Sequence, residues 1–231
     1  NRCTEIYLQF REVPHSIFAR GGANLMLPTL ARVAELSKGQ KPFAVVIGCA
    51  DSRVPANEIC GVLPGEMFVH RNVANLVVHS DLNCLSVMEF AIDSLQVKHI
   101  MVVGHYGCSG VHAAMNDVRI GLADNWLRHV QDVRNQHRQW LYSLPEGAIR
   151  VDALCELNVL EQCLNVCQTT VVQDAWARGQ EVVVHGWVYG LHNGLINDMR
   201  MSVASAEALA GVYDQALDEL RRRYADRSQA V

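Results

Sequence analysis

The sequence predicts an α/β fold with a central, mainly parallel sheet of about four to five strands, helices on both faces and helical arms at both ends. Two observations carry this prediction. Short runs of apolar and β-branched residues recur along the chain, as strands buried on both faces require. Longer stretches between them repeat their apolar residues at helical spacing. Strands that alternate with helices in this way form parallel sheets.

Four short runs are predicted as strands and five longer stretches as helices. The strands cover residues 43–47, 67–70, 100–103 and 182–185, and Gly104 is expected to end the third. The helices cover residues 27–36, 81–95, 126–140, 151–177 (one helix or two) and 204–224. We expect a single domain over residues 1–231, made of an N-terminal arm (1–37), an α/β core (38–195) and a C-terminal helical segment (196–231).

Composition argues against several classes of partner. Half of the residues are apolar and 19% are charged, so the chain can build a sizeable core. The net charge is −4, and no long run of Lys or Arg offers a surface for nucleic acid or anionic lipid. The longest apolar runs fall far short of the ~20 residues of a membrane span. We therefore expect a protein with neither nucleic-acid nor membrane partners.

The eight cysteines favour a reducing compartment. A chain of this length and apolar content has no need of disulfides. Cys84, Cys155, Cys163 and Cys167 lie in apolar, helix-like stretches, where we expect buried thiols. The sequence therefore predicts a cytoplasmic protein, and two further cysteines call for a separate explanation.

Those two cysteines belong to motifs that directly follow predicted strands. Cys49-Ala-Asp51-Ser-Arg53 follows the first strand, and His105-Tyr-Gly-Cys108 follows the third. If these strands are adjacent, two thiols and an imidazole meet beyond their carboxyl ends, where open α/β sheets bind ligands. Cysteine and histidine are preferred zinc ligands, and three protein ligands with one open position form the catalytic arrangement.

A structural zinc site and a redox dithiol are the alternatives to a catalytic centre. Both favour C-x-x-C spacings, and the sequence has none. Asp51 and Arg53 favour catalysis, because alternate residues of an extended segment share a face with Cys49. A carboxylate there can ligate the metal or accept a hydrogen bond from its water, and an arginine can orient that carboxylate.

These motifs together resemble the β-class carbonic anhydrases. The resemblance covers roughly residues 38–195 and includes two further segments, Pro64-Gly65-Glu66 and Arg71-Asn72-Val73-Ala74-Asn75. It implies reversible hydration of CO2 to bicarbonate and a proton. It also implies one zinc ion per subunit, held by Cys49, His105 and Cys108, while Asp51 pairs with Arg53.

The resemblance further implies that zinc-bound hydroxide attacks CO2 held in an apolar pocket. That pocket maps onto Phe68, Val73 and Phe90, and the family's pocket glutamine maps onto Gln40. Two thiolates cancel the charge of Zn²⁺, so its water should be less acidic than the pKa of ~7 reached with three histidines. We therefore predict activity that rises with pH on the alkaline side of neutrality.

Other segments resemble the bicarbonate-regulated branch of this family. They are Asp81-Leu-Asn-Cys-Leu-Ser, Cys155-Glu-Leu-Asn-Val and His185-Gly-Trp-Val-Tyr-Gly. In that branch Asp51 can release Arg53 and bind zinc itself, and Val54 is the small residue that follows the arginine. Arg71 and Tyr189 match two bicarbonate anchors, but Val46 stands where the branch has a tryptophan. The resemblance thus implies a site that Asp51 can close, with weakened bicarbonate sensing.

Other functions and the state of assembly complete the expectations. A zinc hydrolase of a related linear substrate such as CS2 would share the fold and the metal. A catalytically silent, zinc-stabilised interaction or bicarbonate-sensing protein is the alternative from another class. A nucleotide-binding domain is disfavoured, because no G-x-G-x-x-G follows the first strand. The helix over 81–95 is apolar nearly all round, which favours a dimer. The resemblance implies a homodimer or homotetramer.

Overall fold

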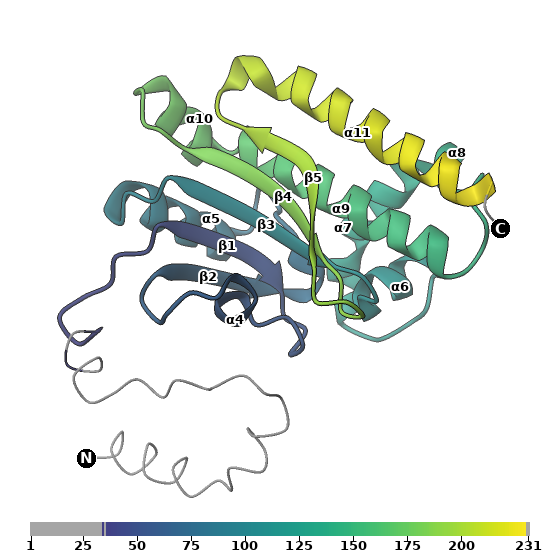
Figure 1. Cartoon of the computed structure of the whole chain (residues 1–231), viewed down its shortest axis with the longest axis horizontal. Coiled ribbons are helices and arrows are strands. Elements are labelled where there is room, and N and C mark those ends of the chain that lie inside the picture. Colours follow the sequence, from purple (N-terminus) through teal and green to yellow (C-terminus); the bar gives the residue numbers. More distant parts are fainter. Residues whose placement is uncertain (1–33, 35, 230–231) are drawn as a thin grey trace, which may run out of the picture. The chain divides into compact units, whose positions relative to one another are not determined.

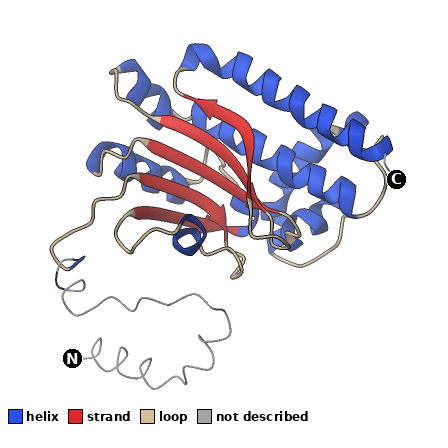
Figure 2. Cartoon of the chain, viewed as in Figure 1, coloured by secondary structure: helices blue, strands red, loops and turns tan. Residues whose placement is uncertain are grey.

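The strands of the described chain form one sheet in the order β2-β1-β3-β4-β5, shown in red in Figure 2. They are β1 (Ala44–Cys49), β2 (Met67–Asn72), β3 (His99–His105), β4 (Val183–Tyr189) and β5 (Ile196–Val203). Neighbouring strands from β2 to β4 pair in parallel, whereas β5 pairs antiparallel with β4. The predicted α/β fold with a mainly parallel sheet is confirmed.

The computed structural model describes residue 34 and residues 36–229. Residues from Gln40 onward belong to one compact unit. The predicted N-terminal arm (1–37) and the predicted helix over 27–36 lie almost wholly outside the described residues. Within the described part, no helix combines the length and the apolar character that crossing a bilayer requires.

Helices connect the first four strands along the chain, a turn joins β4 to β5, and a long helix follows β5 (Figure 1). They are α4 (Ala56–Cys60), the 3₁₀ turn η1 (Val73–Asn75), α5 (Leu82–Glu89), its π-helical continuation η2 (Phe90–Ser94), α6 (Ser109–Met115), α7 (Ala123–Gln136), α8 (Arg138–Leu141), α9 (Ala148–Gln168), α10 (Thr170–Ala177) and α11 (Ala206–Gln229). Asp81 caps α5, since its side chain accepts a hydrogen bond from the backbone N–H of Asn83.

The two faces of the sheet are covered unequally. On one face, side chains such as Ile47, Ile100 and Val184 join a large core that includes buried residues of α5, α6, α7, α9 and α11. On the other face, a smaller cluster around Val46, Met101 and Val103 packs against Ala56 and Cys60 of α4. Because α4 is short, this second face is much less deeply covered than the first.

Helix α9 lies at the centre of the large core. Its buried side chains include apolar residues such as Leu154 and Leu160, and it packs against β3, β4 and α11. It also buries the polar residues Glu156, Asn158 and Gln162, which is unusual inside a hydrophobic core. Such groups are retained where they find hydrogen-bond partners, and here those partners lie beside the candidate functional residues.

Two expectations about local structure need correction. Gly104 does not end the third strand, since β3 continues through it to His105. This glycine instead allows a close approach, because a Cβ atom there would lie 2.5 Å from Cγ2 of Val159 on α9. Residues 196–203, expected to begin a helical segment, form β5 and bury Met199, Met201 and Val203 in alternation.

Candidate metal centre

Adjacent strands bring the candidate ligands together. Cys49 is the last residue of β1 and His105 the last of β3, and these strands pair in parallel. The chain passes from β1 to β2 on one side and from β3 to β4 on the other, so ligands are expected beyond the ends of β1 and β3. The short turn after β3 adds Cys108, which precedes α6.

The geometry of these three side chains fits a metal ion. Their ligand atoms lie within 4.8 Å of one another, and all three residues are buried. The two sulfur atoms are 3.9 Å apart. Two sulfurs bound at about 2.3 Å to a tetrahedral zinc would be roughly 3.8 Å apart. The observed separation therefore matches that of a pair of thiolate ligands.

His105 presents one ring nitrogen to this space. Its Nδ1 lies 2.9 Å from the backbone carbonyl oxygen of Tyr106, and a carbonyl can only accept, so Nδ1 carries the proton. The other nitrogen, Nε2, is buried and has no hydrogen-bond partner within the described residues. An unsatisfied buried nitrogen is costly unless something binds it, and a metal ion would supply that partner.

The two thiols are electrostatically coupled. A hydrogen bond from the Cys108 thiol, supported by the backbone N–H groups of Asp51 and Ala74, lowers the pKa of Cys49 to about 4. The same hydrogen bond, together with burial, raises the pKa of Cys108 well above its usual range. The pair alone thus holds one negative charge and one proton. A divalent cation would stabilise both thiolates.

The turn after β2 supports Cys49 through an uncommon backbone conformation. Ala74 and Asn75 have φ angles of 68° and 47°, a region that residues other than glycine seldom occupy. The Asn72 side chain braces this turn with two hydrogen bonds to the backbone of Leu76, at 2.7 and 2.8 Å. Asn158 of α9 donates to the carbonyl oxygen of Ala74 at 2.9 Å. Surrounding contacts therefore hold the strained turn in place.

Asp51 and Arg53 form a two-point ion pair at the entrance to the site. Arg53 Nε donates to Asp51 Oδ1 at 2.9 Å and Nη2 donates to Oδ2 at 2.6 Å. These hydrogen bonds hold the pKa of the Asp51 carboxyl well below its usual range, so it stays ionised at neutral pH. Asp51 Oδ2 is also 3.8 Å from Nε2 of His105. A charged acceptor thus lies directly beside the candidate metal position.

Comparison with known proteins agrees with this geometry. Residues 44–196 match the family model described as "Carbonic anhydrase". A carbonic anhydrase of Emericella nidulans is 46% identical over 167 residues, which cover 72% of this chain and 73% of that protein. The chain belongs to the β-class carbonic anhydrase family. The matched range contains Cys49, His105 and Cys108, together with Asp51 and Arg53.

Solved structures of β-carbonic anhydrases share this fold. A Coccomyxa enzyme in complex with acetazolamide superposes with a TM-score of 0.73 at 40% identity, covering 77% of this chain and 81% of the other. One of two tetrameric enzymes from Sordaria macrospora superposes with a TM-score of 0.72 at 32% identity, covering 88% of this chain and all of the other. The architecture of the family therefore extends across most of this chain.

The residues expected to line a CO2 pocket are only partly brought together in this carbonic anhydrase. The rings of Phe68 and Phe90 are neighbours, with centroids 5.9 Å apart. Phe90 and Val73 nevertheless remain 48% and 39% exposed. Gln40 is exposed in the segment before β1. A single chain therefore leaves these apolar side chains open to solvent.

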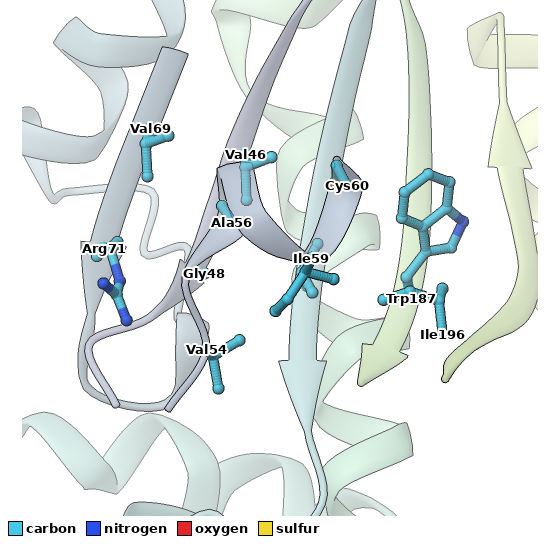
Figure 3. Close-up of a pocket in the computed structure, with 11 residues that line it drawn as sticks. Val46, Gly48, Val54, Ala56, Ile59, Cys60, Val69, Arg71, Trp187 and Ile196 are labelled. Atoms are coloured by element: carbon cyan, nitrogen blue, oxygen red, sulfur yellow. The ribbon is translucent and has the colours of Figure 1, made fainter. Parts of the chain in front are cut away.

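Two of the three residues expected to sense bicarbonate, Val46 and Arg71, line a different pocket, on the face of the sheet that α4 covers (Figure 3). Its lining includes Val46 and Arg71, with Ile59 and Cys60 from α4 and Trp187 from β4. Figure 3 shows Arg71 and Trp187 at opposite sides of the pocket. Arg71 donates through Nε to the carbonyl oxygen of Cys49 at 2.8 Å and through Nη2 to that of Asp51.

The third matched position, Tyr189, is not among the residues that line this pocket. The pocket is mostly apolar, and its arginine already binds two backbone carbonyl groups. An anion entering it would find a single cation, Arg71, whose hydrogen bonds already go to the backbone, and otherwise mostly apolar side chains. The three matched positions therefore do not surround one common polar cavity.

Sequence reasoning missed the polar side chains that support the site. Glu156 and Asn158 stand in a segment that resembles the family, and Tyr106 separates His105 from Cys108, but no role could be assigned to them. One signal was present: polar residues interrupt the otherwise apolar stretch over 148–168. A polar residue inside a buried helix needs a partner, but the sequence alone does not name that partner.

Proposed function

We propose that this chain binds one zinc ion per subunit through Cys49, His105 and Cys108 and catalyses the reversible hydration of CO2 to bicarbonate and a proton. The convergence of two thiols 3.9 Å apart with an unpartnered imidazole nitrogen, within the residues that the structure describes, carries this proposal. Membership of the β-class carbonic anhydrase family supports the reaction. Zinc bound here would supply a Lewis acid that lowers the pKa of water.

The residues around the metal position have distinct roles in this proposal. The ionised Asp51 carboxylate can only accept hydrogen bonds, so it orients a water molecule or the hydroxyl group of bicarbonate. A bound anion that has no proton to donate would be repelled by it. Arg53 holds that carboxylate in position through two parallel hydrogen bonds. Phe68, Val73 and Phe90 provide an apolar environment for CO2 and keep bulk water away.

Self-association would complete this apolar environment. Val73 and Phe90 are exposed in the single chain, and apolar side chains beside a reaction centre are normally covered. The Sordaria macrospora relative is described as tetrameric. We therefore propose that this chain forms dimers or tetramers in which a second copy covers Phe90 and Val73.

Regulation by Asp51 is a further part of the proposal. The carboxylate lies 3.8 Å from the histidine nitrogen, so a small movement away from Arg53 would bring it to the metal position. The apolar character of the pocket around Val46 argues that bicarbonate is a weak effector. A crystal structure at low pH should show Asp51 released from Arg53. An unchanged ion pair under those conditions would contradict closure by Asp51.

The compartment is proposed from thiol chemistry. The seven cysteines in the described part of the chain are all free, and free thiols persist in a reducing compartment such as the cytoplasm. Fractionation of cells that express the natural protein tests this assignment. Recovery in an oxidising compartment would contradict it.

Metal analysis combined with a stopped-flow CO2 hydration assay tests the proposed function. The wild-type protein should contain one zinc per chain and hydrate CO2 faster as pH rises above neutrality. Cys108→Ser should lose zinc and activity together, because it removes one thiolate ligand. Cys84→Ser is the matched control, since it alters a fully buried thiol on α5 and should retain zinc. Zinc-free, inactive wild-type protein would contradict the proposal.

A further inference from the structure

A buried carboxylate lies behind the candidate metal centre. Glu156 of α9 is fully buried, and its two oxygens accept three hydrogen bonds. Tyr106 and Tyr224 donate their hydroxyl groups to Oε1 at 2.7 and 2.9 Å. Arg223 Nη2 donates to Oε2 at 2.6 Å and balances the charge. A buried carboxylate is tolerated only when it is paired and hydrogen-bonded in this way.

One of these three donors leads directly to the metal centre. Tyr106 follows His105, and its carbonyl oxygen accepts the Nδ1 proton of the His105 ring at 2.9 Å. The backbone N–H of Tyr106 donates to the carbonyl oxygen of Tyr189 on β4 at 3.1 Å. The hydroxyl group and the N–H therefore anchor Tyr106 at two points. Its carbonyl oxygen is in turn held where it orients the imidazole.

We propose that Glu156 is a positioning residue for the metal centre, acting through Tyr106 to aim Nε2 of His105 at the two cysteines. This inference rests on the proposed zinc site. The partner of a ligating histidine fixes both its tautomer and the direction of its ring. Glu156 extends that support one step further and links it to Arg223 and Tyr224 of α11.

The alternative is that Glu156 serves stability alone, and α9 offers a matched control for it. Glu161, also buried on α9, accepts hydrogen bonds from His137 at 2.7 Å and from a tyrosine of α11, Tyr213. Within the described part of the chain, its hydrogen bonds reach neither Tyr106 nor the three candidate ligands. Glu156→Gln and Glu161→Gln therefore make similar chemical changes in similar surroundings, and only the first reaches His105.

The tyrosines provide a second matched pair. Tyr106→Phe and Tyr224→Phe each delete one hydroxyl group that donates to the same oxygen of Glu156. Of the two, Tyr106 is the one whose carbonyl oxygen holds His105. If Glu156→Gln fails to fold, these two variants still decide between positioning and stability.

Zinc affinity, measured by chelator competition, and the absorption spectrum of the cobalt(II)-substituted protein are the readouts. We expect Glu156→Gln and Tyr106→Phe each to weaken zinc binding about tenfold and to shift the cobalt spectrum. Tyr224→Phe and Glu161→Gln should bind zinc within about twofold of wild type, with an unshifted spectrum. The double variant Glu156→Gln/Tyr106→Phe should be no weaker than either single variant, because both act through one route.

The outcomes separate this inference from the proposed function. If wild-type protein binds zinc but Tyr106→Phe behaves like Tyr224→Phe, the positioning role is wrong and the zinc site stands. Equal zinc affinities of Glu156→Gln and Glu161→Gln would overturn the positioning role in the same way. If wild-type protein binds no zinc or cobalt, the proposed function fails and this inference fails with it.

Discussion

Asp51 and Asp124 are two similar carboxylates in different surroundings. Each pairs with an arginine two or five residues away, at 2.6 Å to Arg53 and 2.7 Å to Arg119. Each accepts a backbone N–H as well, and these contacts lower the pKa of both carboxyl groups. The two ion pairs differ in what lies around them. Asp51 Oδ2 lies 3.8 Å from Nε2 of the buried His105. The ion pair of Asp124 lies at the surface, where the Arg119 side chain is 90% exposed.

At this scale we predict that Asp51→Asn lowers the CO2 hydration rate about 100-fold while zinc content stays near one per chain. The amide keeps the size of the side chain but can donate hydrogen bonds, so it no longer presents a charged, acceptor-only group. Stopped-flow assay and metal analysis check both parts. Asp124→Asn is the control and should remain within about twofold of wild type.

The direction of the Asp51 pKa shift adds a pH expectation. Arg53 holds this pKa well below its usual range, so the carboxylate remains charged at neutral and alkaline pH. The predicted rise of wild-type activity above neutrality therefore cannot come from ionisation of Asp51. Full activity in Asp51→Asn would contradict its assignment to the reaction.

At the scale of elements, α9 sets the position of the strand that ends in His105. Val159 of this helix approaches two glycines, Gly104 on β3 and Gly186 on β4. A Cβ atom at these positions would lie 2.5 and 3.2 Å from Val159 methyl groups. The same helix donates a hydrogen bond to the strained turn through Asn158 and binds Tyr106 through Glu156. One helix thus supports both the segment that carries His105 and the turn whose Ala74 backbone N–H contacts Cys49.

We predict that Gly104→Ala destabilises the fold by about 1–3 kcal/mol, because the added methyl group forces α9 and β3 apart. Gly48→Ala on β1 is the control. Its Cβ would have ordinary contacts, with the nearest atom at 3.7 Å, so a much smaller loss is expected. Adding Val159→Ala to Gly104→Ala should recover part of the stability by making room. Thermal unfolding measures all four proteins, and equal losses for the two glycine variants would refute the close-packing argument.

At the scale of the whole molecule, the sheet and its helices leave several large apolar side chains uncovered. The helix predicted over 81–95 buries Cys84, Met88, Ala91 and Ile92, as its apolar periodicity requires. Two of its other apolar residues, Leu82 and Phe90, are 76% and 48% exposed. Large apolar side chains that remain exposed can mark a contact surface with another chain.

We predict that Phe90→Ser weakens self-association by about 10- to 100-fold, since burying a phenylalanine contributes about 1.5–3 kcal/mol. Light scattering over a range of protein concentrations should show dissociation at concentrations where the wild-type protein remains assembled. Val118→Ser is a control that removes a similarly exposed apolar side chain from the loop between α6 and α7. A wild-type protein that is monomeric throughout would overturn the proposed assembly.

Particular residues show how far sequence reasoning reaches. The four predicted strands exist because β-branched, apolar runs suit buried parallel strands, and Cys49 and His105 lie at the ends of two that pair. Sequence reasoning misses the strand over 196–203, although Met199, Met201 and Val203 alternate, because polar residues between them resemble the start of an amphipathic segment. The expected strand end at Gly104 is wrong. This glycine is needed because Val159 of α9 packs closely against it, and residues next to Gly104 in the sequence give no sign of that contact.

By itself, the sequence determined the chemistry available to this protein and the types of its main elements. Residue types and their periodicity act locally, so two thiols, an imidazole and a carboxylate–arginine pair can be recognised from short motifs. Only the tertiary structure decided which elements became neighbours. It placed β3 beside β1, Asn158 beside Ala74 and Glu156 beside Tyr106, because such pairings depend on how the whole core packs.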